Sequence, residues 1–416
     1  MKKYIFRIVT IIGLVLSNLC FSQTSNNEIV IGKSYTITSN SLKDERLVEV
    51  YLPESYSTTE AAYPVLYIFD GQMHFENGIA IQKSLQTPGV IPEMIVVGVM
   101  NEYPSRRDLG WSNKEVYHSF LEQELIPFVN ENFRTNNERV LFGWEQGAFM
   151  ATYMVLNKKP LFNGVILSNG GNATPEMLTE FVNSNAKETF YMYMVNSIKD
   201  IYTIQYSDKF FELIDKSTPS NLEFKYEKLN EETHETLPYL ALFHGLKYFY
   251  HNYKTLDYSS FKEYEDLGGL PYLKKYFSER GRRFGFSTHI ADETKNGLIW
   301  LAWNKDNFNY FKFFMTEFKD VLSTKRYDSA YWQNRFGQMY LKHKDLDTAI
   351  MYFSNGINTY GDSRELSQMY YGLSKAFAGK KQKRKAINNI KLAIKTAENK
   401  SEESLNDYKT YLAELR

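Results

Sequence analysis

The stretch from residue 139 to residue 156, RVLFGWEQGAFMATYMVL, constrains the fold of this chain more than any other. It begins with a short apolar run at residues 140–142, which is typical of a buried strand. Residues 143–147, GWEQG, predict a tight turn, because a glycine at each end lets the backbone bend sharply. The residues that follow are mostly apolar and contain no proline, so they predict a helix. The stretch therefore predicts a strand, a sharp turn and a helix.

This layout is that of a nucleophile elbow, in which a strand-to-helix turn holds one side chain above the edge of a sheet. The usual elbow sequence is G-x-S-x-G, and here Glu145 stands at the serine position. The sequence thus predicts the scaffold of a serine hydrolase without its nucleophile.

The composition is that of an ordinary globular protein. With 416 residues, of which 43% are hydrophobic, the chain can bury a large core and should form about two or three domains. Lys plus Arg equal Asp plus Glu at 49 each, so the charge gives no indication of a nucleic-acid partner. We expect no nucleic-acid binding, no cofactor and no metal.

Residues 1–22 are typical of a signal peptide. Three cations, at positions 2, 3 and 7, precede an apolar stretch that is short for a membrane span, and small residues at positions 20 and 22 predict cleavage before Gln23. A lipid anchor on Cys20 is the alternative, but the preceding Leu19 is too large for it. Cleavage would remove the only cysteine and with it all disulfide and thiol chemistry. We expect an exported protein, periplasmic or extracellular, without a stable membrane span.

The next 220 or so residues alternate between strand and helix patterns. Near alternation of apolar and polar residues predicts two strands, compatible with an antiparallel hairpin, and two continuous apolar runs suit central strands buried on both faces of a parallel sheet. The expected strands are 28–39, 46–52, 63–69, 93–100, 162–168, 189–195 and 222–229. The expected helices are 115–133, 175–182, 204–214 and 236–250, and a loop and a helix are expected over 73–85. This alternation predicts an α/β domain with a mainly parallel sheet.

Three polar residues follow strands of this expected sheet, at the edge where such sheets bind ligands. Glu145 lies in the elbow, Asp200 is the only acid in the loop after residue 195, and His234 lies in the loop after the last strand. This is the chain order of the triad in α/β-hydrolases, where the acid orients the histidine and the histidine takes the proton of the nucleophile. We expect these three residues to form the site, with Asp208 and Glu232 as alternative acids.

Several segments of residues 28–252 together resemble the putative-esterase branch of the α/β-hydrolases, which includes enterochelin-esterase-like, esterase D-like and feruloyl-esterase-like proteins. These segments are VYLP at 50–53, YPVLYIFDGQ at 63–72, RDL at 107–109, FL at 120–121, ELIP at 124–127, the elbow, and THET at 233–236. The resemblance implies an α/β-hydrolase sandwich with a mainly parallel central sheet, acting on carboxylic esters of the siderophore, acetyl or feruloyl kind.

The catalytic turn is where the chain departs from this family. The family elbow resembles G-H-S-x-G-G, whereas this chain has Trp144, Glu145 and Ala148 at the second, third and sixth positions. The resemblance also implies that the oxyanion would bind the backbone N–H of Gln146 and an N–H just after residue 70. That second donor falls on Gly71 or Gln72.

Glu145 allows several interpretations. Attack on an ester would give a mixed anhydride, and a carboxylate is a much weaker acyl acceptor than an alkoxide activated by histidine. Some α/β-hydrolases with Asp at the elbow instead form an alkyl-enzyme ester, after which the histidine activates water, but Glu is one methylene longer. An ion pair with His234 and a metal site with Asp200 and His234 are further alternatives, the second without a spacing motif. The preferred interpretation is a pseudoesterase that keeps its ligand pocket.

The pattern changes beyond residue 250. Residues 253–295 predict a linker and helical connector, and residues 296–416 predict helix pairs that resemble tetratricopeptide repeats, in which small residues lie where two helices touch. One unit contains Gly337, Tyr340, Ala349, Phe353 and Gly356, a second contains Leu373, Phe377, Ala386, Ile390 and Ala393, and a degenerate first unit covers 296–322. Such repeats are either packing alone or a groove for a peptide or protein partner. The basic run at 380–385 is interpreted as a solvated turn.

The predicted architecture is therefore a signal peptide at 1–22, an esterase-like α/β-hydrolase domain at 23–252, a connector at 253–295 and all-α helical repeats at 296–416. The predicted ligand is a small ester-like molecule bound by the second of these parts, with a protein or peptide partner for the last.

Overall fold

The computed structural model describes residues 29–101, 113–156, 161–184, 189–217 and 219–416. The predicted signal peptide and the RDL segment at 107–109 lie outside these residues. The chain divides into two compact units, Met1–Lys254 and Thr255–Arg416. Among the described helices, none combines the length and hydropathy that crossing a membrane requires.

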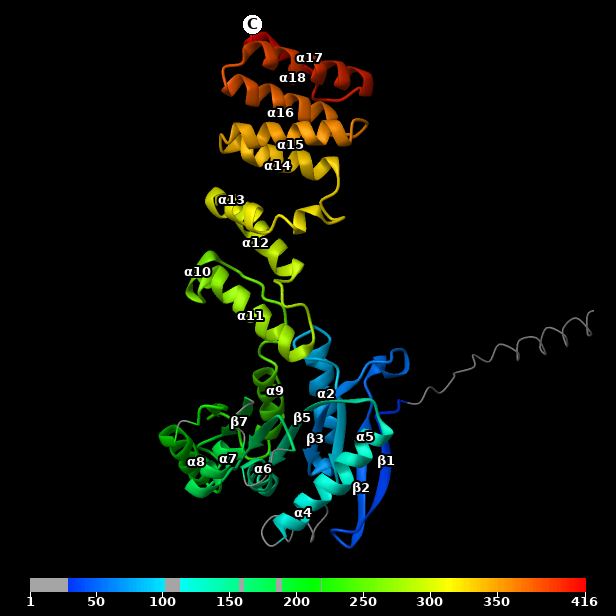
Figure 1. Ribbon diagram of the computed structural model, residues 1–416, viewed down its shortest axis with the longest axis vertical. Coiled ribbons are helices and arrows are strands. Elements are labelled where there is room, and N and C mark those ends of the chain that lie inside the picture. Colours follow the sequence, from blue (N-terminus) through cyan, green and yellow to red (C-terminus); the bar gives the residue numbers. More distant parts are fainter. Residues whose placement is uncertain (1–28, 102–112, 157–160, 185–188, 218) are drawn as a thin grey trace, which may run out of the picture. The chain divides into compact units, whose positions relative to one another are not determined.

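The described part of the first unit contains one eight-stranded sheet in the order β1-β2-β4-β3-β5-β6-β7-β8 (Figure 1). β1 pairs antiparallel with β2 and β2 with β4, and the remaining neighbours are parallel. The strands are β1 (Lys33–Ser39), β2 (Asp44–Tyr51), β3 (Tyr63–Phe69), β4 (Ile95–Val99), β5 (Thr135–Trp144), β6 (Gly164–Ser168), β7 (Phe190–Asn196) and β8 (Leu222–Lys228). The predicted mainly parallel α/β fold is confirmed.

Helices cover both faces of this sheet. α2 and α9 contact each other on one face. On the other face α4 contacts α6, α6 contacts α7 and α7 contacts α8, and the strands share one apolar core with α4 to α8. The helices of the first unit are α2 (Gly71–Gln86), α4 (Lys114–Phe120), α5 (Ile126–Asn132), α6 (Gln146–Leu156), α7 (Pro175–Ser184), α8 (Ile204–Ser217) and α9 (Leu237–Phe249). Continuous apolar strands such as β3, buried at every residue, follow from this two-sided covering.

One local prediction was wrong. A loop and a helix were expected over 73–85, but α2 covers this whole range and begins at Gly71, because Asp70 reverses the chain in one residue with a left-handed φ of 56°. The helical spacing expected over 115–133 is confirmed, and within it a π-helical turn, Leu121–Leu125, lies between α4 and α5. Pro127 lies at the start of α5 and has no N–H to donate, which explains why the regular ladder is interrupted there.

The second unit is made of helices in the part that the structure describes. They are α10 (Phe261–Asp266), α11 (Gly269–Phe284), α12 (Asp292–Asn304), α13 (Phe308–Glu317), α14 (Ala330–Lys342), α15 (Leu346–Thr359), α16 (Leu366–Gly379), α17 (Lys383–Lys400) and α18 (Leu405–Glu414). Helices from α14 onward contact their neighbours in chain order. The first two lie where a connector was predicted, and Tyr264 and Phe277 on them are buried in the core of this unit.

Small residues lie where these helices touch. The buried ring of Phe353 on α15 fits between Gly337 on α14 and Gly372 on α16. A Cβ on either glycine would stand 2.5 or 2.4 Å from that ring. An α-helical domain thus follows the α/β unit, and its assignment as tetratricopeptide repeats stays a prediction.

We predict that Gly337→Ala destabilises the protein, although alanine is the better helix former by about 1 kcal/mol. The added Cβ overlaps the ring of Phe353, and such overpacking costs about 1–3 kcal/mol. The measurement is the thermal midpoint followed by circular dichroism. Gly361→Ala is the control, because its Cβ would meet its nearest neighbour at an ordinary 3.5 Å. A midpoint of Gly337→Ala equal to that of the parent would contradict this packing.

Candidate functional site

A single residue makes the turn between β5 and α6. Glu145 has a left-handed φ of 51°, a conformation that is uncommon outside glycine and costs about 1–3 kcal/mol. The turn is held by the backbone: the Glu145 N–H donates to the Ser168 carbonyl at 3.0 Å, and the Glu145 carbonyl accepts the Ala148 N–H at 3.0 Å. The strand-turn-helix predicted from the sequence therefore has the geometry of an elbow.

Glycines allow close approach around this turn. A Cβ on Gly143 would lie 2.3 Å from the carbonyl oxygen of Gly147, so both ends of the motif need to be compact. A Cβ on Gly147 would lie 3.2 Å from Oδ2 of Asp70, which brings the start of α6 against the end of β3. On another side, a Cβ on Gly170 would lie 3.1 Å from the carbonyl oxygen of Glu145.

Asp200 and His234 are in direct contact. Nδ1 of His234 lies 3.0 Å from Oδ2 of Asp200, whose side chain is fully buried, whereas that of His234 is 22% exposed. Asp200 lies after β7 and His234 between β8 and α9. The structure thus brings together two of the three residues that the sequence singled out, at the carboxyl ends of neighbouring strands.

The surroundings of Asp200 keep it ionised. Burial alone would raise the pKa of Asp200, but hydrogen bonds from Thr203, Asn169 and His234 outweigh it and hold this pKa below its ordinary value. Since an ionised carboxylate only accepts, Nδ1 of His234 carries the hydrogen of this bond in the neutral ring. Its Nε2 is then the acceptor, which is the arrangement that a general base needs.

Trp144 connects His234 to the elbow. The indole and imidazole centroids are 5.0 Å apart, and Nε1 of Trp144 donates to the backbone carbonyl of His234 at 3.2 Å. Trp144 is mostly buried and immediately precedes Glu145. Trp144 therefore supports the loop that carries His234.

Asn169 is a site residue that sequence reasoning missed. It is fully buried and has a left-handed φ of 55°. Its Nδ2 donates to Oδ2 of Asp200 at 2.8 Å, and its Oδ1 accepts from Oγ of Ser168 at 2.5 Å. Because the carbonyl of Ser168 also accepts from Glu145, this asparagine links the elbow to the buried acid. The only signal in the sequence is a polar residue directly after a buried strand.

The loops after β7 and β8 are tied together as well. Oγ of Ser197 donates to the backbone carbonyl of Glu232 at 2.8 Å, and the Leu229 N–H donates to the carbonyl of Asn196 at 2.9 Å.

The alternative acid Asp208 accepts from the hydroxyl of Tyr226 at 2.8 Å and pairs with Lys228. His234 is therefore held by Asp200, and neither Asp208 nor the side chain of Glu232 takes that place.

The expected oxyanion donors lie at helix starts. Gly71 and Gln72 open α2, and Gln146 opens α6. The first N–H groups of a helix have no partner within it and carry its positive dipole end, so they suit a developing negative charge. The side chain of Gln72 also exchanges two hydrogen bonds, of 2.9 and 3.1 Å, with the backbone of Asn101, which fixes the start of α2 against the end of β4.

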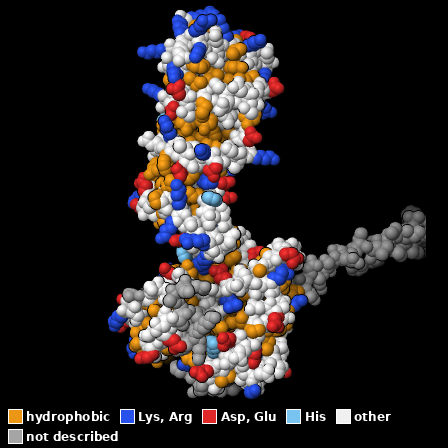
Figure 2. Space-filling model, viewed as in Figure 1, with side chains coloured by type: hydrophobic (Ala, Val, Ile, Leu, Met, Phe, Trp, Pro, Cys, Tyr) orange, Lys and Arg blue, Asp and Glu red, His pale blue; other side chains and the backbone are white. Residues whose placement is uncertain are grey.

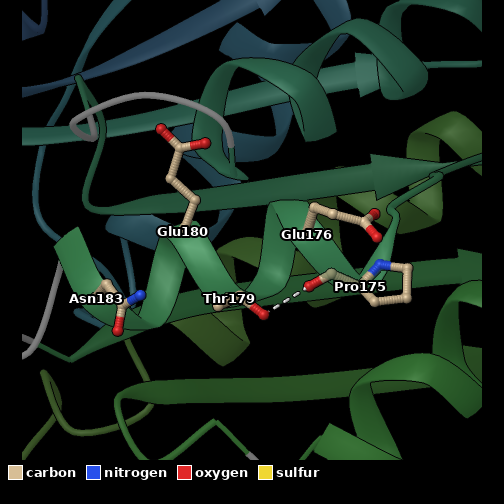
Figure 3. Close-up of a pocket in the computed structure, with 5 residues that line it drawn as sticks. All are labelled: Pro175, Glu176, Thr179, Glu180 and Asn183. Atoms are coloured by element: carbon tan, nitrogen blue, oxygen red, sulfur yellow. Dashed lines mark hydrogen bonds between the residues drawn. The ribbon is translucent and has the colours of Figure 1, made fainter.

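Two other kinds of site are less well supported. A surface hollow of about 580 Å³ runs along α7 and contains none of the predicted site residues (Figure 3). Its lining residues all belong to that helix: Pro175, Glu176, Thr179, Glu180 and Asn183. Among the described residues, no three His, Cys, Asp or Glu side chains are grouped so as to hold a metal ion, so the geometry gives no support to a metal site at Glu145.

Comparison with known proteins identifies the class first. The first unit has the α/β-hydrolase fold, which it shares with an IroE-like serine hydrolase from Shewanella oneidensis (TM-score 0.50, 20% identity, 68% of this chain and 98% of that chain). An uncharacterised protein from Capnocytophaga ochracea is similar over more of the chain (TM-score 0.56, 19% identity, 79% of this chain and 94% of that one). At these identities the likeness concerns the fold alone.

The sequence matches then point to a family. Residues 39–190, from the end of β1 to the start of β7, match the family described as "Putative esterase". The uncharacterized protein YbbA of Bacillus subtilis (strain 168) is 28% identical over 153 residues, which are 33% of this chain. The match spans 61% of that relative, less than two thirds of its length. The first unit is thus similar to the putative-esterase family over residues 39–190.

We predict that Asp200→Asn destabilises the protein in a pH-dependent way. The folded pKa of Asp200 lies below its ordinary value of 3.8, so its charge stabilises the fold above that pH and ceases to do so as the pH falls through the folded pKa. Urea unfolding of the parent and Asp200→Asn from pH 7 downward should give a stability difference that is constant above about pH 5 and shrinks below about pH 4. A difference that grows on acidification would contradict the assignment.

We also predict that Asn169→Ala lowers the free energy of unfolding by about 1–3 kcal/mol, because it leaves buried polar partners without their hydrogen bonds. The matched control is Asn172→Ala, three residues further along in the same loop, where the side chain is exposed and the change should be within about 0.5 kcal/mol. Urea unfolding measures both. Equal stabilities of the two variants would show that Asn169 has no such structural role.

Proposed function

We propose that this chain is an exported pseudoesterase, which binds a small ester-like ligand in its α/β-hydrolase unit and a protein or peptide partner through its helical unit. The observation that carries the proposal is the combination of an intact Asp200–His234 pair with Glu145 at the elbow. The parts that support a nucleophile are present, and the serine is not.

The chemistry of a carboxylate explains why ordinary ester hydrolysis should fail. A serine hydroxyl has a proton for histidine to remove, and its removal generates a strong nucleophile. Glu145 as a carboxylate has no such proton to give, and its attack on an acyl group yields a mixed anhydride rather than an ester. His234, as a base, then has no proton to remove from the residue at the elbow. Ligand binding remains, because helix starts and loops around the site do not depend on the residue at 145.

One alternative rests on a specific observation. The buried Asp200 orients His234 as a base, and a base in that position activates water in α/β-hydrolases that use an elbow carboxylate. Glu145 would then attack an alkyl carbon, displacing a halide or opening an epoxide, and form an alkyl ester. Water that loses a proton to His234 would hydrolyse this ester and release the alcohol and the Glu145 carboxylate. An active carboxylic-ester hydrolase of the siderophore, acetyl or feruloyl type is the other alternative, and it needs a different nucleophile.

The proposed location and partner follow from the sequence and from the second unit. The pattern of residues 1–22 supports export, to the periplasm or beyond. Stacked helix pairs of this kind present extended surfaces to partners, which supports a peptide or protein ligand for residues 296–416.

The test is hydrolysis of short p-nitrophenyl esters by the mature chain. We expect an inactive parent and an inactive Glu145→Ala control. Glu145→Ser should gain turnover of at least roughly 10²-fold over both, because a serine there can lose its proton to His234. Adding His234→Ala to Glu145→Ser should remove that gain.

The opposite pattern is equally clear. Turnover by the parent that Glu145→Gln abolishes would make Glu145 a working catalytic group. Turnover by the parent that survives Glu145→Gln would place the nucleophile elsewhere. Either result contradicts the pseudoesterase proposal.

A further inference from the structure

In the second unit α14 and α16, the first helices of two successive pairs, contact each other, and an aromatic contact joins α12, the first helix of the preceding pair, to α14. Trp300 on α12 contacts Trp332 on α14, with ring centroids 5.3 Å apart. Nδ2 of Asn334 on α14 donates to Oε1 of Gln368 on α16 at 2.8 Å. These contacts define a continuous surface, the first-helix face, whose residues are Trp300, Tyr331, Arg335, Gln368, Tyr371 and Lys375.

Arg335 lies in the middle of an aromatic cluster on this face. Its guanidinium carbon lies 5.0–5.5 Å from the centroids of four rings, those of Trp300, Trp303, Tyr331 and Trp332. One N–H group donates to the hydroxyl of Tyr331. Within the described part of the chain, no carboxylate forms an ion pair with Arg335. A half-buried arginine that rests on rings and keeps spare donors fits a planar carboxylate well.

Lys375 repeats this arrangement on the next helix pair. Its Nζ lies 4.2 Å from the ring centroid of Tyr371, and among the described residues it too has no carboxylate partner. In both helices a tyrosine precedes the cation by four residues, which places the two on one side of the helix. Other cations nearby are neutralised: Lys342 pairs with Asp306 at 2.7 Å. The two cations on the first-helix face are therefore left available.

The charge around this face favours an anionic occupant. Neither α14 nor α16 contains an Asp or Glu residue. Residues 255–416 carry 27 Lys and Arg against 20 Asp and Glu, and Figure 2 shows basic side chains gathered over the C-terminal helices. Trp, Tyr and Arg are also the residues that contribute most to protein–protein binding energy. An apolar or cationic partner would leave Arg335 and Lys375 without counter-charges.

We propose that the first-helix face binds an extended peptide segment of a protein partner through two acidic side chains, one at Arg335 and one at Lys375. This inference rests on the proposed partner role of the helical unit and adds the chemistry that selects the partner. The four rings around Arg335 and the ring of Tyr371 beside Lys375 would contact the apolar neighbours of the two acids and exclude water from the ion pairs.

The test uses the full mature chain and an array of short N-acetylated, C-amidated peptides. Each peptide carries two Glu residues in a background of Ala, Leu and Phe, and the array covers every spacing between the two Glu residues. Each peptide has a matched analogue with Gln in place of Glu. Tryptophan fluorescence reports binding directly, because three of the five tryptophans of the chain lie beside Arg335. At least one acidic peptide should bind, at least roughly tenfold more tightly than its Gln analogue.

Variants locate the binding surface. Arg335→Gln and Lys375→Gln should each weaken binding of that peptide at least roughly tenfold, since each removes a charged hydrogen-bond donor. Lys391→Gln is the matched control: it removes the same charge from an exposed position on α17, the second helix of its pair, and should leave binding unchanged. Lys375 is exposed, so its variant should fold normally. Arg335→Lys keeps the positive charge and tests whether the planar guanidinium group is needed.

Each other outcome is decisive. Equal loss of affinity in Arg335→Gln, Lys375→Gln and Lys391→Gln would show that net charge alone attracts the peptide, and it would overturn the proposed surface. Equal affinity for acidic peptides and Gln analogues would overturn the recognition of acids while leaving the partner role of the helical unit intact. Binding of no peptide in the array would overturn both.

Discussion

The buried carboxylate of Asp200 is the interaction on which the candidate site depends. It accepts hydrogen bonds from Asn169 after β6, from Thr203 after β7 and from His234 after β8, so one ionised group joins the ends of three neighbouring strands. Without these donors, the buried charge would strongly destabilise the folded protein. The position of His234 therefore follows from the packing of the sheet ends and does not require any particular residue at the elbow.

The backbone of the turn at Glu145 likewise does not require a particular side chain at that position. Its backbone is set by close contacts at Gly143, Gly147 and Gly170 and by hydrogen bonds to the strand and helix on either side. Serine and glutamate are both unbranched at Cβ, so a left-handed φ at position 145 costs about the same for either. In the proposed pseudoesterase, glutamate in place of serine therefore changes the chemistry of the elbow and leaves its architecture unchanged.

Sequence patterns predicted the strands well because burial on both faces leaves continuous apolar runs such as β3. They missed the one-residue reversal at Asp70, since a left-handed residue other than glycine has no distinctive pattern. Chain order was enough to select Asp200 and His234, but not Asn169, whose role comes from the side-by-side placement of β6 and β7. Hydrogen bonds between loops that are distant in sequence depend on the assembled sheet and leave no local signal.

We propose that the elbow, its neighbouring N–H groups and His234 are still arranged for a nucleophile that is absent. Covalent trapping tests it most directly: a fluorophosphonate forms a P–O bond with an activated serine and loses fluoride, which intact-mass spectrometry detects. We predict no adduct on the parent, stoichiometric labelling of Glu145→Ser at that position, and slow or no labelling once His234→Ala is added. Labelling of the parent, or a Glu145→Ser variant that folds but stays unlabelled, would contradict it.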